Sequence, residues 1–181
     1  MYNHLNQYRC TIIRGKSQHE IDDLLPAYAK IIEDICPCDG DDFLELFNSA
    51  LLSYMPQAIK KTLDNHRTEI VGKLFGMYYL ADDGYIYPSE RCKKFIEDND
   101  QPAFFKDVCF KMQFPNGMDK PGTISERKDH KINIRQSSYL LKVLLCAKNA
   151  GIVFTKYDIG YYVLNSLDVL QRVAKPLEVI E

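Results

Sequence analysis

Long hydrophobic runs are missing from this 181-residue chain. No segment approaches the roughly 20 consecutive apolar residues that a helix needs to cross a bilayer, which excludes a membrane-spanning helix. The first ten residues, MYNHLNQYRC, are too polar for a secretory signal. A composition of 46% hydrophobic and 27% charged residues is typical of folded, water-soluble proteins. We therefore expect a cytoplasmic protein with no membrane partner.

Cysteines and histidines at metal-ligand spacing are also scarce. The six cysteines are scattered, and only Cys36 and Cys38 are close, with one residue between them. Typical zinc sites place two to four residues between such ligands. We therefore predict no metal site and no cofactor for these residues. Cys92, Cys109 and Cys146 lie in apolar runs, which predicts small core side chains.

An excess of positive charge is lacking as well, because the net charge is −2. This excludes a uniformly basic nucleic-acid binder, so the distribution of charge is more informative than its sum. Residues 1–19 carry three bases and no acid, residues 20–45 carry one base and nine acids, and residues 106–136 carry seven bases and four acids. The two basic blocks are candidates for one phosphate-facing side, and the acidic block is typical of a solvated face.

The first part of the chain predicts three helices. Apolar residues recur at intervals of three and four over residues 20–35, and Pro26 favours a helix that starts late, near Leu25. Two further helices are expected over residues 42–54 and 57–71. The tight link between them is typical of a helix-turn-helix.

A β-hairpin is expected directly after these helices. Strands over residues 73–80 and 85–87 flank the turn Asp82-Asp83-Gly84, and a helix capped by Ser89 follows over residues 91–98. The order helix, turn, helix, hairpin, helix is typical of a winged helix, in which the hairpin closes a three-helix core.

The second part of the chain predicts mostly helix. Helices are expected over residues 103–114 and 135–150, and two shorter ones over 156–164 and from Leu167. Two glycines and two prolines predict an irregular segment at residues 115–131, and long loops of this kind are often functional.

The predicted fold class is mainly α (α+β), with winged-helix or helix-turn-helix subdomains and a small β-hairpin wing. We expect a winged-helix DNA-binding subdomain with a basic N-terminal arm over residues 1–100. Residues 101–181 are expected to form a second helical subdomain, whose winged-helix-like order can be incomplete.

A series of short motifs runs through residues 74–175 in a fixed order. The motifs are Gly84-Tyr85, Phe105-Lys106, Lys111-Met112-Gln113-Phe114-Pro115, Ile132-Asn133-Ile134, Ala150-Gly151 and Lys156-Tyr157-Asp158-Ile159. In this order and with these gaps the chain resembles the DNA-recognition region of AlwI-like type IIS restriction endonucleases and the related nicking endonucleases. A fainter likeness covers residues 8–32, and residues 36–72 do not align.

The resemblance implies a sequence-specific double-stranded DNA recognition domain that binds a short asymmetric site as a monomer. In this family a separate C-terminal nuclease domain cuts the DNA, and that domain lies outside these residues. Within this chain the resemblance therefore implies no catalytic residue. Mg²⁺ is expected only for the absent nuclease domain or subunit.

One acidic motif has the spelling of a nuclease metal site. Such a site needs an acid followed at a distance by Asp or Glu, any residue, and Lys, so that Mg²⁺ can bridge the scissile phosphate and a water. Asp119 with Glu126 and Lys128 meets this spelling, but Pro121 and Gly122 lie between them where adjacent strands are required. An autonomous Mg²⁺-dependent nuclease is therefore the third hypothesis.

The basic segments supply the candidate DNA contacts. Arginine is the usual reader of guanine, glutamine and asparagine can read adenine, and lysine suits phosphates. The candidates are Arg9, Arg14, Lys16, Ser17 and His19 in the arm; Lys60, Lys61, Asn65 and Arg67 in the second helix of the helix-turn-helix; and Lys111, Gln113, Asn116, Lys120, Arg127, Lys128, Lys131, Arg135 and Gln136 in and beside the irregular segment.

A second hypothesis is a winged-helix transcription regulator or a protein-interaction domain. A regulator is expected to dimerise on a palindrome, whereas the endonuclease hypothesis predicts a monomer on an asymmetric site of about 4 to 7 base pairs.

Overall fold

The computed structural model describes residues 18–179, without the side chains of residues 18–21, 161 and 162. The chain forms two compact units and passes from one to the other within α5 (Gln101–Lys111), between Val108 and Cys109. We call residues 18–108 the first unit and residues 109–179 the second unit. The sequence-based boundary lay at residues 100 and 101, which is the start of α5.

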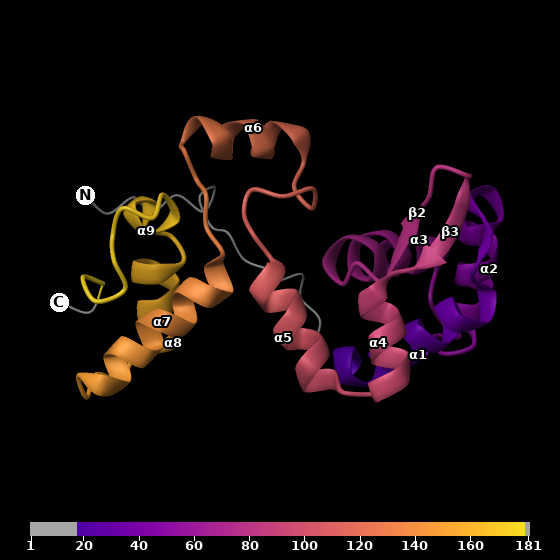
Figure 1. The fold of residues 1–181 in the computed structure, drawn as a ribbon, viewed down its shortest axis with the longest axis horizontal. Helices are drawn as coiled ribbons and strands as arrows, with labels where there is room; N and C mark the ends of the chain where they lie inside the picture. Colours follow the sequence, from indigo (N-terminus) through magenta and orange to yellow (C-terminus); the bar gives the residue numbers. More distant parts are fainter. Residues whose placement is uncertain (1–17, 180–181) are drawn as a thin grey trace. The chain divides into compact units, whose positions relative to one another are not determined.

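The first unit is helical with one small sheet (Figure 1). Its strands lie in the antiparallel order β1-β3-β2. The elements are α1 (Gln18–Ile35), β1 (Cys38–Asp39), α2 (Gly40–Leu52), α3 (Lys60–Asn65), the π-helix η2 (His66–Leu74), β2 (Tyr78–Leu80), β3 (Tyr85–Pro88), α4 (Glu90–Asp98) and α5. The predicted mainly α class with a small hairpin is confirmed, while the winged-helix assignment stays a prediction.

Three details of the first unit differ from the sequence-based expectation. The late helix start near Leu25 is wrong, because α1 is already helical at Gln18 and holds Pro26 in its interior. The strand predicted from residue 73 begins only at Tyr78, because the preceding helix continues to Leu74. β1 was not predicted, since two residues are too few for an alternating pattern.

The core of the first unit is built from the predicted helix faces. Leu25 and Ile32 of α1 and Phe47 of α2 are fully buried, as the spacing of three and four predicts. Phe75 contacts Phe104 edge to face, with ring centroids 5.4 Å apart. These contacts join α5 to the end of η2 within the same core.

The second unit contains a helix where the sequence predicted none. Its elements are α6 (Pro121–Asp129), α7 (Gln136–Asn149), α8 (Lys156–Asp158), the π-helix η3 (Ile159–Val163) and α9 (Leu167–Leu170). The prediction of an irregular segment over residues 115–131 is therefore wrong for most of its length, because α6 lies within it. Pro121 stands in the first turn of α6, where proline is tolerated because its missing N–H needs no partner.

A short antiparallel bridge joins the two ends of this segment. Phe114 N–H donates to Ile134 O over 2.8 Å, and Ile134 N–H donates to Phe114 O over 3.1 Å. Both side chains are buried and pack with Tyr139 and Val143 of α7. The predicted helix over 135–150 is thereby placed on the core of the second unit.

The described cysteines are thiols, but only Cys92 is fully buried; Cys109 and Cys146 are half-buried, so the core prediction is confirmed for Cys92 alone. Burial raises the pKa of Cys92 to about 12.

No helix among the described residues is long and apolar enough to cross a membrane.

Arg91 at the start of α4 provides a test of the first unit. Its Nε donates to the Asp107 carboxylate over 2.6 Å, and its Nη1 donates to the carbonyl of Phe75. We expect Arg91→Ala to lower the free energy of unfolding by about 2 kcal/mol, because hydrogen bonds from a half-buried charge are lost. The measurement is urea denaturation.

Lys93→Ala is the matched control for Arg91→Ala. Lys93 lies on the same helix and pairs with the exposed Glu90, so its loss should change the unfolding energy by less than about 0.5 kcal/mol. Equal effects of the two substitutions would contradict a bracing role for Arg91.

Candidate nucleic-acid interface

The candidate contacts of the first unit separate into two groups. Lys60, Lys61 and Asn65 are exposed on α3. The Arg67 side chain is only 12% exposed and donates to Asp64 over 3.2 Å. Arg9, Arg14, Lys16 and Ser17 lie outside the described residues, and the side chain of His19 does too.

The environment of Arg127 does not suit its predicted role as a guanine reader. It is 7% exposed, its Nη1 donates to the Asp119 carboxylate, and its guanidinium lies 5.4 Å from the centre of the Phe114 ring. An arginine can form a bidentate pair with guanine only if its guanidinium reaches the groove. We therefore leave Arg127 out of the interface and assign it to the core of the second unit.

Two other candidates of the second unit have restricted side chains. Gln136 is 5% exposed, so it does not present its amide to a partner. Asn116 is half-buried and closes a turn, donating to Gln113 O over 2.8 Å and accepting from Met118 N over 3.0 Å. The exposed candidates that remain in this unit are Lys111, Gln113, Lys120, Lys128, Lys131 and Arg135.

A hollow of about 730 Å³ in the second unit brings two of these candidates together with residues that the sequence analysis missed. We call it the basic hollow. It is lined by Phe110, Gln113, Asn133, Ile134, Arg135, Ser138, Tyr139, Lys142, Arg172, Ala174, Lys175 and Pro176.

The bridge between Phe114 and Ile134 shapes one wall of the basic hollow. Side chains alternate across an extended backbone, so the burial of these two residues turns their neighbours outward. Gln113, Asn133 and Arg135 are accordingly all exposed. Gln113 Nε2 donates to Asn133 Oδ1 over 2.7 Å, which ties the two segments together on the outer side as well.

The segment after α9 also contributes to the lining. Tyr139 Oη donates to the carbonyl of Ala174 over 2.8 Å, and Gln171 Nε2 donates to the carbonyl of His130 over 2.6 Å. Burial, with a smaller contribution from the charge of Glu178, raises the pKa of Tyr139 to about 12. The phenol therefore stays protonated and keeps donating at neutral pH.

The basic hollow concentrates positive charge. Arg135, Lys142, Arg172 and Lys175 line it, and its described lining contains no carboxylate. Glu178 lies beside it and reaches Lys175 Nζ over 3.9 Å. Within residues 18–179 the other three cations take part in no ion pair. Cations gathered without counter-charges repel one another, so the arrangement favours an anionic partner.

The sequence held a signal for one of the missed cations. Lys142 lies in α7 seven residues after Arg135, the residue that precedes the helix, and a spacing of two helical turns places a side chain near the same side. Arg172 and Lys175 had no such signal, because they join the site only where the chain after α9 folds back onto α7 through Tyr139.

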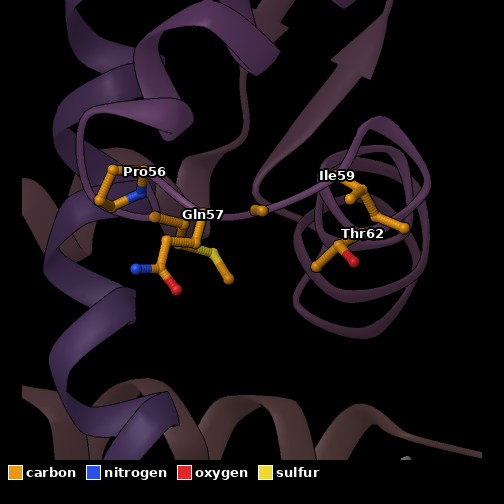
Figure 2. A pocket seen from close by; sticks show the side chains of 6 residues that line it. Pro56, Gln57, Ile59 and Thr62 are labelled. Atoms are coloured by element: carbon orange, nitrogen blue, oxygen red, sulfur yellow. The ribbon is translucent and has the colours of Figure 1, made fainter.

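A second hollow, of about 510 Å³, lies in the first unit at the link between α2 and α3. Figure 2 shows Pro56 and Gln57 on the link and Ile59 and Thr62 at the start of α3. Ile59 is 67% exposed, and the described lining carries no charge. This hollow occupies the predicted helix-turn-helix link but lacks the charge that attracts phosphate.

The acidic spelling of a nuclease site is not assembled. Asp119 is held by Arg127 and precedes α6, whereas Glu126 and Lys128 lie within that helix and not on a strand beside Asp119. In the part of the chain that the structure describes, no group of three or more histidine, cysteine or acidic residues could hold a metal ion.

Comparison with protein families identifies the chain. The family model described as "Restriction endonuclease BpuJI - N terminal" matches residues 2–181. The chain belongs to this family. The expected class, a domain of a restriction endonuclease, is thereby confirmed, whereas the finer likeness to AlwI-like enzymes stays a prediction.

A solved structure of the BpuJI type is also similar. Its description is "Crystal structure of pyrene- and phenanthrene-modified DNA in complex with the BpuJ1 endonuclease binding domain". The two chains are 60% identical with a TM-score of 0.91, and the match covers 99% of the present chain and 65% of the other. The present chain thus spans slightly less than two thirds of that one. Among the curated proteins no match was found.

The role assigned to Arg127 in this BpuJI-type domain can be tested by stability. We expect Arg127→Ala to lower the free energy of unfolding by about 3 kcal/mol, because it leaves the largely buried Asp119 carboxylate without its partner. The exposed neighbour Lys128 is the control, and Lys128→Ala should stay within about 0.5 kcal/mol. If the Arg127→Ala protein kept the parental stability but no longer bound nucleic acid, Arg127 would belong to the interface and not to the core.

The raised pKa of Tyr139 gives a pH test. The folded pKa lies above the ordinary value of about 10, so stability from the protonated phenol is complete below pH 10 and falls as the pH rises towards 12. We expect Tyr139→Phe to cost about 1 kcal/mol near pH 7 through the lost hydrogen bond. The difference from the parent should narrow between pH 10 and 12 in denaturant titrations. A constant difference across that range would contradict the assignment.

Proposed function

We propose that the chain is the double-stranded DNA recognition domain of a type IIS-like restriction endonuclease. The observation that supports this most directly is the 60% identity, over 99% of the chain, to a binding domain described in complex with DNA. The basic hollow supplies a physical reason, because its cations suit the phosphates of a duplex. A single copy of the domain binds a short asymmetric site.

Cutting, on this proposal, is done by a nuclease domain or subunit outside these residues. The pairing of Asp119 with Arg127 argues against an autonomous Mg²⁺-dependent nuclease within the chain. Mg²⁺ is then required by the nuclease domain and not for DNA binding. Membership of a restriction endonuclease family favours this proposal over a transcription regulator.

The cations of the basic hollow should hold the duplex without regard to sequence. Each phosphate contact that is lost removes about 0.9 from the slope of log affinity against log salt concentration. We therefore expect Lys142→Ala and Arg172→Ala each to weaken binding to all duplexes alike and to flatten this slope by about 0.9. Fluorescence anisotropy over a salt series in metal-free buffer measures both quantities.

Lys148→Ala is the matched control, because Lys148 is an exposed lysine in the last turn of α7 and does not line the hollow. It should keep the parental affinity and slope. The proposal fails if the parent protein binds no duplex in a random pool. The assignment of the hollow fails if Lys142→Ala and Arg172→Ala behave like Lys148→Ala.

A further inference from the structure

The amide pair formed by Gln113 and Asn133 lines the basic hollow together with its cations. Both side chains are exposed, so the bond between them adds little to stability. Their backbones are fixed by the bridge of Phe114 and Ile134, whose side chains are 2% and 1% exposed. The pair is therefore a polar group held at a defined place on a rigid support.

The hydrogen bond between the two amides determines what they can still bind. Each side-chain amide offers a carbonyl acceptor and an NH₂ donor. One donor and one acceptor are used in the 2.7 Å bond, and among the described residues neither side-chain amide makes another hydrogen bond. Whichever amide donates, one NH₂ group and one carbonyl oxygen remain without a hydrogen bond among the described residues, and both belong to side chains that line the hollow.

This combination of one donor and one acceptor matches one base edge in the major groove. Adenine presents the N7 acceptor beside the N6 amino donor, whereas guanine presents two acceptors, cytosine a donor, and thymine an acceptor with a methyl group. We infer that the paired amides of Gln113 and Asn133 read one adenine of the recognised duplex. The inference rests on the proposed function and adds to it a specificity-determining pair.

The experiment selects bound duplexes from a random pool in metal-free buffer. The parent, Gln113→Ala, Asn133→Ala and the control Lys148→Ala are compared, each checked for a parental melting temperature. In the parent we expect a fixed adenine at one position, and in both alanine variants this position alone relaxes. Discrimination at that position should fall by about 5- to 150-fold.

Two further measurements keep the inference testable if an alanine variant unfolds. Gln113→Glu keeps the size of the side chain but makes it an acceptor only, so the preference at that position should move from adenine towards cytosine. In the parent, 7-deazaadenine at that position removes the N7 acceptor and should weaken binding. At other adenines, the effect of the same replacement on binding should not change when Gln113 or Asn133 is substituted.

The outcomes separate this inference from the proposed function. If the parent enriches no duplex, the proposed function fails. If the parent enriches a defined site and the Gln113 and Asn133 variants keep every base preference, the inference fails while the proposed function stands. A loss of affinity in these variants that is equal for all duplexes also overturns the inference, because it assigns the pair to phosphate contact.

Discussion

The second unit depends on one buried cation. Arg127 lies between the Asp119 carboxylate and the ring of Phe114, and its own backbone carbonyl accepts from Ile132 N–H over 2.9 Å. A charge removed from water is tolerated only when it is paired, so this contact sets the path of the chain on both sides of α6. It returns the chain to Ile134 and thus closes the bridge on which the amide pair stands.

Features that depend on local chemistry could be predicted from the sequence. Ser89 caps α4 and Thr155 caps α8 through hydrogen bonds from residues three positions later, as short polar side chains before apolar runs predict. Gly151 adopts a φ of 71° after α7, which explains why the helix ends there. The helix faces of the first core follow the same local rules.

Features that depend on distant partners could not be predicted in this way. The glycines and prolines around α6 are typical of a loop, whereas the burial of Arg127 against residues before the helix stabilises the helical form. The basic hollow also depends on distant partners. Arg172 lines it because the segment after α9 folds back onto α7, where Tyr139 donates to the carbonyl of Ala174. Of the predicted contacts that lie within the described residues, only Gln113 and Arg135 line it.

A net charge of −2 is compatible with the proposed DNA-binding surface because acids and bases are segregated along the chain. Phosphate attraction acts over about 8 to 10 Å at physiological salt, so the cations gathered in the hollow matter more for a bound phosphate than the net charge of the whole chain. On the proposed function, those cations would supply affinity that is the same for every sequence, whereas the neutral amides would supply little affinity but distinguish donors from acceptors on base edges. A surface that must choose one site among many therefore needs both kinds of residue on one support, and the Phe114–Ile134 bridge holds Arg135 and the amide pair together in this way.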